Sequence, residues 1–434
     1  MKVGLYGGMA NNMYVAAAAL HKEGIDTCFI HDRVDSFAFS QPLWQDIRWA
    51  PSSQEINQSV NWSQNTWRER EAELGWIGPK WCSDPQEHGE EKKSINTKKI
   101  NILNARIIQR ILNWSNAGSS REAVIQLMRR CDILMVCGVS AVLLARLSGV
   151  PYVIWPHGED IRQASGNYWV PAKGIKESLS RFVLTKVLAN SFKKAAWIGT
   201  HDPQGVSFNR CNIPFAYRHL PLPMPTSVGA PDQCKNTIRE NLNRELNLTI
   251  ESDKHVWLIP SRIDKYWKKQ QLFIKAILSH TISETSQIII SGWGKDCDEI
   301  RQSLTDKHFK RIIFLKGPIS KPILYDFYRA SDVVVDQFRS GTYGTTLIES
   351  ASVGTPVLSY INNEYFIKRG WMPPPVLNGK TEEDIKNILN GIYSGNICPK
   401  FEGTKSRAWV EKIHGGKNVV PKLKEQFENA LIRE

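Results

Sequence analysis

Ten short apolar runs, rich in β-branched residues, limit most strongly what this 434-residue chain can fold into. Each run is long enough for a strand, and most are separated by stretches long enough for a crossover helix. Continuous apolar character is typical of strands buried on both faces of a parallel sheet. The pattern therefore predicts the α/β class, with two Rossmann-like, doubly wound parallel-sheet domains in series. The expected strands cover 2–7, 27–31, 132–137, 152–157, 195–200, 255–260, 287–292, 311–317, 332–338 and 356–361.

A proline-rich segment, "HLPLPMPTSVGAPDQ", marks the boundary between the two halves. Proline removes backbone donors and disfavours helix in the preceding residue. We expect two domains on either side of this linker, meeting at a cleft, because ligands of open α/β sheets bind beyond the carboxyl ends of the strands. The expected parts are an N-terminal domain over 1–220 on the acceptor side, a linker over 221–250, a C-terminal domain over 251–403 on the donor side, and helices over 404–434 that pack back on the first domain.

Residues 40–125 interrupt the strand–helix rhythm. They hold six tryptophans between positions 44 and 81, followed by the basic stretch "KKINILNARIIQRILNW". Its apolar residues recur at helical spacing. The stretch is either an interfacial helix on anionic lipid or an ordinary domain helix with a solvated face.

Composition narrows the class of partner. The net charge is +13 and the isoelectric point about 9.3, which favours nucleic acid, an anionic membrane or a phosphorylated small molecule. The basic residues are dispersed and no nucleic-acid module is present, so we expect no nucleic-acid partner. The eight cysteines show no CxxC spacing and no apolar run approaches the length of a membrane span, so a cytoplasmic protein, peripheral on a membrane at most, is expected.

Two cations follow the first expected strand of the second half. In "IPSRIDKYWKKQQLFIKA" the strand ends near Ser261, Arg262 follows, and Lys268 lies six residues later. A forked guanidinium and a point-like ammonium on one loop can both bind a diphosphate. Surface salt bridges are the alternative for the segment by itself.

A glycine-rich turn and helix start follow further along. The next strand ends at Gly292, and "SGTYGTTLIES" places an open helix start before Glu349, a carboxylate suited to a diol such as ribose. Exposed helix amides attract phosphate and hydroxyls add donors. The candidate ligand-binding residues of this stretch are Gly341, Thr342, Tyr343, Gly344 and Thr345.

The first half contributes a strand and a Gly7–Gly8 turn with Asn11 in the loop, but no GxGxxG dinucleotide fingerprint. The segment "YVIWPHGED" brings His157 to a strand end, before a glycine turn. We expect this histidine to face the ligand, although a lone histidine is more often structural.

In their order these segments resemble the GT-B nucleotide-sugar glycosyltransferases, and in particular the retaining GT4-like family. The resemblance covers about 1–30, 130–165 and 255–361. It implies that Arg262 and Lys268 hold a donor diphosphate, that the 342–345 amides hold phosphate and sugar, that Glu349 holds ribose, and that His157 contacts the donor sugar. Gly7 and Gly8 would lie near the diphosphate or acceptor. Gly341 stands where the family has the first glutamate of its signature, and Asp336 or Glu159 could supply that carboxylate.

The resemblance implies a glycosyltransferase that moves sugar from a nucleotide-diphosphate donor to a glycan or lipid-linked acceptor with retention. We expect no cofactor and no metal, and interpret "DCD" at 296–298 as structural. The alternatives are a sugar-nucleotide 2-epimerase of the same fold and a non-catalytic sugar-nucleotide or glycan binder.

Overall fold

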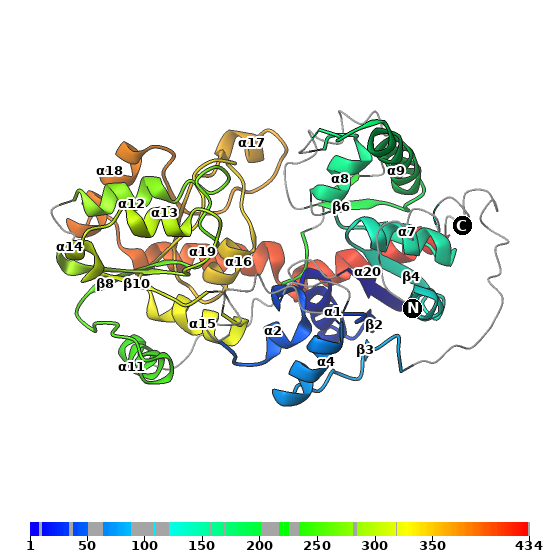
Figure 1. Ribbon diagram of the computed structural model, residues 1–434, viewed down its shortest axis with the longest axis horizontal. Helices are drawn as coiled ribbons and strands as arrows, with labels where there is room; N and C mark the ends of the chain where they lie inside the picture. The colour runs from blue at the N-terminus through cyan, green and yellow to red at the C-terminus, as the bar shows by residue number, and fades with distance from the viewer. Residues whose placement is uncertain are drawn as a thin grey trace. The chain divides into compact units, whose positions relative to one another are not determined.

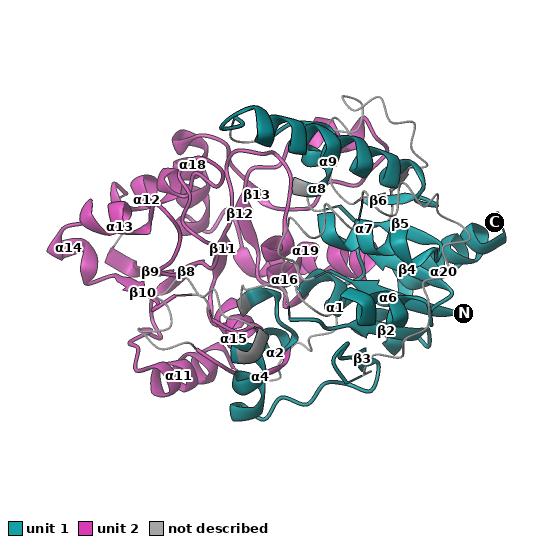
Figure 2. Cartoon of the chain, turned by 45° about the vertical axis from the view of Figure 1, so that its right-hand side comes forward, with its two compact units in different colours: residues 1–45, 61–224, 416–434 teal, residues 46–60, 225–415 magenta. Residues whose placement is uncertain are grey.

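The computed structural model describes residues 1–7, 11–33, 38–50, 64–87, 108, 121–156, 158–168, 171–200, 217–219, 221–224, 234–280, 284–317 and 319–432. The chain forms two compact units (Figures 1 and 2). Unit 1 contains 1–45, 61–224 and 416–434, and unit 2 contains 46–60 and 225–415. The last helix, α20 (Gly416–Ile432), therefore belongs to unit 1, and 46–60 belongs to unit 2 although the sequence suggested the N-terminal domain.

Unit 1 is built on a parallel sheet in the order β3-β2-β1-β4-β5-β6-β7. From β1 the chain adds β2 and β3 on one side and then continues with β4 to β7 on the other side. The topological switch point of this sheet therefore lies between β1 and β4. The strands are β1 (Lys2–Tyr6), β2 (Asp26–Ile30), β3 (Cys82–Ser83), β4 (Ile133–Val136), β5 (Tyr152–Ile154), β6 (Ile198–Thr200) and β7 (Tyr217–His219). Its helices include α1 (Asn12–Lys22), α4 (Gln64–Glu73), α6 (Arg121–Met128), α7 (Val139–Ser148), α8 (Glu159–Ala164) and α9 (Ile175–Lys193), and α2 spans Pro42–Asp46.

Unit 2 repeats the architecture with the parallel order β10-β9-β8-β11-β12-β13, whose switch point lies between β8 and β11. Helices α12 and α13 cover one face of the sheet and α15 the other (Figure 1). The strands are β8 (His255–Ile259), β9 (Ser286–Ile290), β10 (Ile312–Phe314), β11 (Val333–Val335), β12 (Val357–Ser359) and β13 (Leu377–Asn378). The helices are α11 (Lys235–Leu246), α12 (Gln271–Leu278), α13 (Cys297–Gln302), α14 (Asp306–Phe309), α15 (Lys321–Ala330), α16 (Thr345–Ser352), α17 (Asn363–Ile367), α18 (Glu382–Tyr393) and α19 (Pro399–His414).

The predicted fold class is confirmed: two doubly wound parallel sheets, with a strand in each of the ten expected runs. The central strands are buried almost throughout, as their uninterrupted apolar sequences require. Strands β3, β7 and β13 were not expected. They are two- or three-residue strands at sheet edges, too short to leave a pattern in the sequence.

Candidate functional site

The carboxyl ends of β8 and β11 lie side by side at the switch point of unit 2. Their loops are joined by main-chain and side-chain bonds. The Phe338 amide donates to the Lys268 carbonyl (2.9 Å), and the Arg339 guanidinium donates to the Tyr266 carbonyl (2.9 Å) while it stacks on the Tyr266 ring. Open α/β sheets bind ligands at this position. The expected residues after β8 and β11 thus meet at one sheet edge.

Buried polar side chains fix the loop after β8. The Asp264 carboxylate accepts the amides of Tyr266 (3.0 Å) and Trp267 (2.7 Å). The Gln270 side-chain amide donates to the Arg262 carbonyl (2.8 Å) and to the Ser261 hydroxyl (3.2 Å). The Ser261 hydroxyl therefore helps to hold the conformation of this loop.

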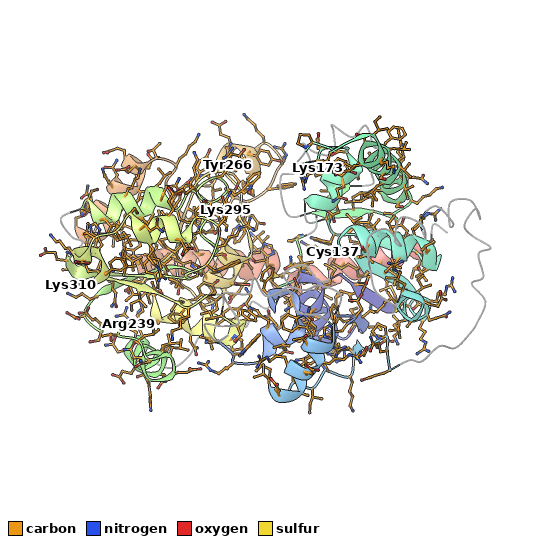
Figure 3. All side chains as sticks on the ribbon, in the orientation of Figure 1. Cys137, Lys173, Arg239, Tyr266, Lys295 and Lys310 are labelled. Atoms are coloured by element: carbon orange, nitrogen blue, oxygen red, sulfur yellow. The ribbon has the colours of Figure 1, made fainter. Side chains whose placement is uncertain are left out.

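Two exposed cations flank Asp264. The Arg262 side chain is 53% exposed and its Nε lies 4.0 Å from one Asp264 oxygen, while Lys295 is 59% exposed with Nζ 3.6 Å from the other. Figure 3 labels Lys295 in the turn after β9, near Tyr266. One carboxylate between two cations leaves the group a net positive charge, which suits an anionic ligand. Sequence reasoning missed Lys295, although it follows Gly292 and Gly294 in the same turn.

Lys268 has a different environment. Its ammonium lies 2.5 Å from Oδ1 of Asp336, a residue with no exposed surface at the end of β11. The other Asp336 oxygen is buried and receives no hydrogen bond from any residue in the described part of the chain. Lys268 thus neutralises a buried carboxylate that retains capacity to accept one more donor. Contact of Lys268 with a diphosphate remains a prediction.

The start of α16 is open. Gly344 is its N-cap, no side chain caps it, and a β-carbon at Gly344 would meet nothing within 4 Å. The amides of the first turn, beginning with Thr345, can therefore receive an anion. The preceding loop is braced because Gln337 donates its side-chain amide to the Thr342 carbonyl (2.7 Å).

Packing within unit 2 explains why glycine stands at position 341 and tyrosine at position 343, just before α16. Gly341 has φ +70°, and a β-carbon there would lie 2.9 Å from Cβ of Asn362, so no side chain fits in this backbone conformation. The Tyr343 ring is buried, stacks on Phe366 and hydrogen-bonds His414 (3.2 Å). Any ligand contact of Tyr343 would therefore come from its main chain.

Glu349 lies in the core and is only 4% exposed. Lys321 forms an ion pair with one of its oxygens, and the Tyr328 hydroxyl donates to the other (3.0 Å). Burial first, and then the Glu349 charge, raises the pKa of Tyr328 well above its ordinary value. The ribose role of Glu349 remains a prediction, and Lys321 is a partner that sequence reasoning missed.

Gly292 and Asp296 support the turn after β9. Gly292 has φ +66°, and its β-carbon would lie 1.7 Å from the Leu315 carbonyl oxygen, so only glycine fits. Asp296 is the N-cap residue of α13 and its carboxylate accepts the Lys265 amide (2.7 Å). Across the described ranges, no three His, Cys, Asp or Glu side chains gather in a way that could hold a metal ion.

Of the unit 1 candidates, the structure describes Gly7 and Asn11, which lie between β1 and α1 at the switch point of that sheet. Gly7 has φ +136° and a β-carbon there would lie 2.3 Å from the carbonyl oxygen of Cys137, which Figure 3 labels. Asn11 is buried with φ +57° and donates its side-chain amide to the Gln41 carbonyl. Gly8 and His157 lie outside the described residues, as do the Glu159 side chain and most of the tryptophan-rich and basic insertion.

A buried ionic cluster near β2 was not foreseen. It joins His31, Arg33, Glu71 and Asp84, and the "HDR" that follows β2 was its only signal. Burial lowers the pKa of His31 more than the hydrogen bond to Glu71 raises it. Burial by itself raises the pKa of Glu71, but the hydrogen bonds from His31 and Arg33 outweigh it and lower the pKa. A pocket lies alongside, lined by Tyr6, Gly7, Phe29, Ile30, His31, Asp32, Arg33, Ser40 and Gln41.

Among the helices that the structure describes, none combines the length and the apolar character that crossing a membrane requires.

We compared the chain with protein families, curated sequences and solved structures. A family model described as glycosyl transferases group 1 matches residues 254–370. No curated protein sequence matches the chain. The chain resembles the structure of Anabaena HepE with UDP and glucose at 13% identity and a TM-score of 0.61, over 99% of this chain and 100% of that one.

Two further structures are similar over the full length. Sucrose-phosphate synthase from Thermosynechococcus elongatus has 13% identity and a TM-score of 0.58, covering 100% of both chains. A glycosyltransferase from Rickettsia africae has 14% identity and a TM-score of 0.56, covering 100% of this chain and 99% of that one. At such identities the likeness establishes the fold. The chain is thus a GT-B-fold protein whose residues 254–370 match the glycosyl transferases of group 1.

Proposed function

We propose that this protein transfers a sugar from a nucleoside-diphosphate donor to a glycan or lipid-linked acceptor. The observation that carries the proposal is the edge of the unit 2 sheet, where Arg262 and Lys295 are exposed beside the loop that leads to the uncapped start of α16. This edge lies within the segment that matches group 1 glycosyl transferases. The HepE structure with UDP and glucose supports a nucleotide-sugar donor.

In this proposal the diphosphate receives the two exposed cations and the first amides of α16. When the bond between the sugar C1 and the diphosphate oxygen breaks, negative charge grows on the leaving group. Preorganised cations and helix amides stabilise that charge in the transition state. The group can thereby do the electrostatic work that a metal ion does in other transferases, and we propose that no metal is needed.

The second half of the step forms the bond from the acceptor hydroxyl oxygen to C1. The hydroxyl proton goes to an oxygen of the departing phosphate, so no protein base is required. Attack from the face that the diphosphate leaves would retain the anomeric configuration. NMR of the product anomer tests retention, and an inverted product contradicts it.

Two rival functions share this site. A 2-epimerase of the same fold would change the donor sugar without an acceptor, and a binding protein would hold the donor without turnover.

The experiment is a donor screen on the full-length protein with UDP-glucose, UDP-N-acetylglucosamine and GDP-mannose as probes. Each is incubated alone, with oligosaccharide acceptors and with lipid-linked saccharides, with and without EDTA. The proposal predicts nucleoside diphosphate release that depends on acceptor and persists in EDTA. Conversion of donor alone to an epimer, or calorimetric binding with no turnover under any acceptor, would establish one of the rivals.

A further inference from the structure

An apolar stripe runs along the outer face of α9 in unit 1. Ile175, Leu179 and Phe182 are 89%, 62% and 58% exposed. Their spacing of four and three residues puts them within about 60° of one another around the helix axis. The three side chains, here called the α9 stripe, therefore form one continuous apolar surface about two turns long.

The α9 stripe and the face by which α9 packs into unit 1 are different sides of the helix. Leu188 and Phe192 are buried in the core, and Val183, Leu184 and Val187 pack against it. On the same core-facing side, the Thr185 hydroxyl donates to the Gln163 carbonyl (3.0 Å). The core that the described residues form thus contains the inner residues of α9 but none of the three residues of the stripe.

Basic residues surround the stripe. Residues 173–194 contain six Lys or Arg and one acidic residue, Glu177, which pairs with Arg181. The ammonium of Lys186 lies 5.4 Å from the centre of the Phe182 ring, on the same face. The exposed lysines of this flank are Lys173, Lys176, Lys186, Lys193 and Lys194, and Figure 3 labels the first of them.

We infer that the α9 stripe and its lysines dock unit 1 on an anionic lipid surface. Exposed Ile, Leu and Phe on a helix can enter the headgroup–acyl boundary, while lysines pair with lipid phosphates. A protein partner would be expected to cover the stripe with apolar surface, but the net charge of +5 over residues 173–194 favours a strongly acidic surface, which an anionic membrane supplies. This surface deepens the proposed function by giving the site of action of an enzyme with a lipid-linked acceptor, yet its test needs no turnover.

The test is co-sedimentation of the full-length protein with vesicles of phosphatidylcholine alone or mixed with phosphatidylglycerol. We expect binding to the anionic vesicles only, weakened by salt. Ile175→Gln is compared with Ile77→Gln, since Ile77 is an equally exposed isoleucine of unit 1 at 88%. The double variants Leu179→Gln/Phe182→Gln and Lys176→Gln/Lys186→Gln complete the set, and unchanged thermal unfolding checks that they fold.

Vesicle affinity should fall about tenfold or more in both double variants and in Ile175→Gln, and stay unchanged in Ile77→Gln. Equal binding by all variants overturns the inference. So does a dimer in gel filtration that the stripe variants abolish without any vesicle binding, because the stripe would then meet a second copy. A protein that turns over donor but ignores vesicles refutes only the docking surface, and vesicle binding without turnover refutes only the enzyme.

Discussion

At the scale of single residues, exposure separates the cations of unit 2 into two kinds. Lys268 and Lys321 lie against the buried carboxylates Asp336 and Glu349, whereas Arg262 and Lys295 extend toward solvent. The sequence could indicate cations near a strand end. It could not indicate which of them is neutralised, because Asp336 lies 68 residues from its lysine.

Glu349→Gln should destabilise the protein by about 3 kcal/mol, because Lys321 then keeps a partly buried charge without its carboxylate. The double variant Glu349→Gln/Lys321→Met should recover much of this loss, and urea unfolding measures both. If Glu349 also binds donor hydroxyls, the double variant recovers stability but not donor affinity. A single variant within 0.5 kcal/mol of the wild type would contradict the buried pair.

The His31–Glu71 cluster predicts a loss of stability as pH falls. The folded-state pKa values of His31 and Glu71 lie below their ordinary values of 6.5 and 4.5, so the unfolded chain binds protons first. Thermal unfolding should therefore occur at lower temperature as pH drops from 7, with the His31 contribution beginning near 6.5. His31→Gln should flatten the upper part of this dependence, and His21→Gln, at an exposed histidine, should not. An unchanged slope in the first variant refutes the assignment.

At the scale of elements, the turn into α16 depends on backbone conformation more than on side chains. The sequence predicted a glycine-rich loop and an open helix start, and both are present. It could not reveal that Gly341 is pressed against Asn362 or that the Tyr343 ring is directed into the core, since both depend on residues from β12 onward.

Placing at position 341 the glutamate that the GT4-like resemblance implies there should fail. Gly341→Glu forces a side chain into the left-handed region and toward Cβ of Asn362, so we expect a loss of about 1–3 kcal/mol and no gain in donor affinity. Gly344 has φ −120°, and a β-carbon there would meet no neighbouring atom. Gly344→Ala should therefore keep the stability of the wild type. Differential scanning calorimetry compares the two. An active, equally stable Gly341→Glu would show that the turn accommodates the carboxylate.

Helix α20 belongs to unit 1 through its aromatic packing. Phe427 is fully buried and stacks on Trp197 with 5.8 Å between ring centres. Phe427→Ala should cost about 3–5 kcal/mol in chemical unfolding. Phe401→Ala in α19, at a residue 59% exposed, should change stability by no more than about 0.5 kcal/mol. Equal effects would mean that α20 adds nothing to the core of unit 1.

At the scale of the whole molecule, the order of strands followed from the apolar runs, but the division of the chain did not. Residues 46–50 join unit 2 through contacts of Trp49 and Arg48. The Ser320 amide donates to the Trp49 carbonyl, the Trp49 amide donates to the Ser320 hydroxyl, and Arg48 pairs with Asp326. These contacts connect positions almost 300 residues apart, so no local sequence pattern predicts them. By contrast, the predicted glycine loops after β1 and β11 and the predicted cations after β8 do lie at the switch points of the two sheets.

The most direct test of the account is calorimetric titration of the full-length protein with UDP and GDP, using Arg262→Ala, Lys295→Ala and the exposed control Lys310→Ala of unit 2. We predict that the wild type binds at least one of the two nucleotides. Each of the first two variants should weaken that binding by about tenfold or more, with unchanged thermal unfolding, because the lost cation is exposed. Lys310→Ala should bind as the wild type does. Equal affinity in all four proteins, or no binding of either nucleotide, would contradict the claim that this sheet edge holds the donor diphosphate.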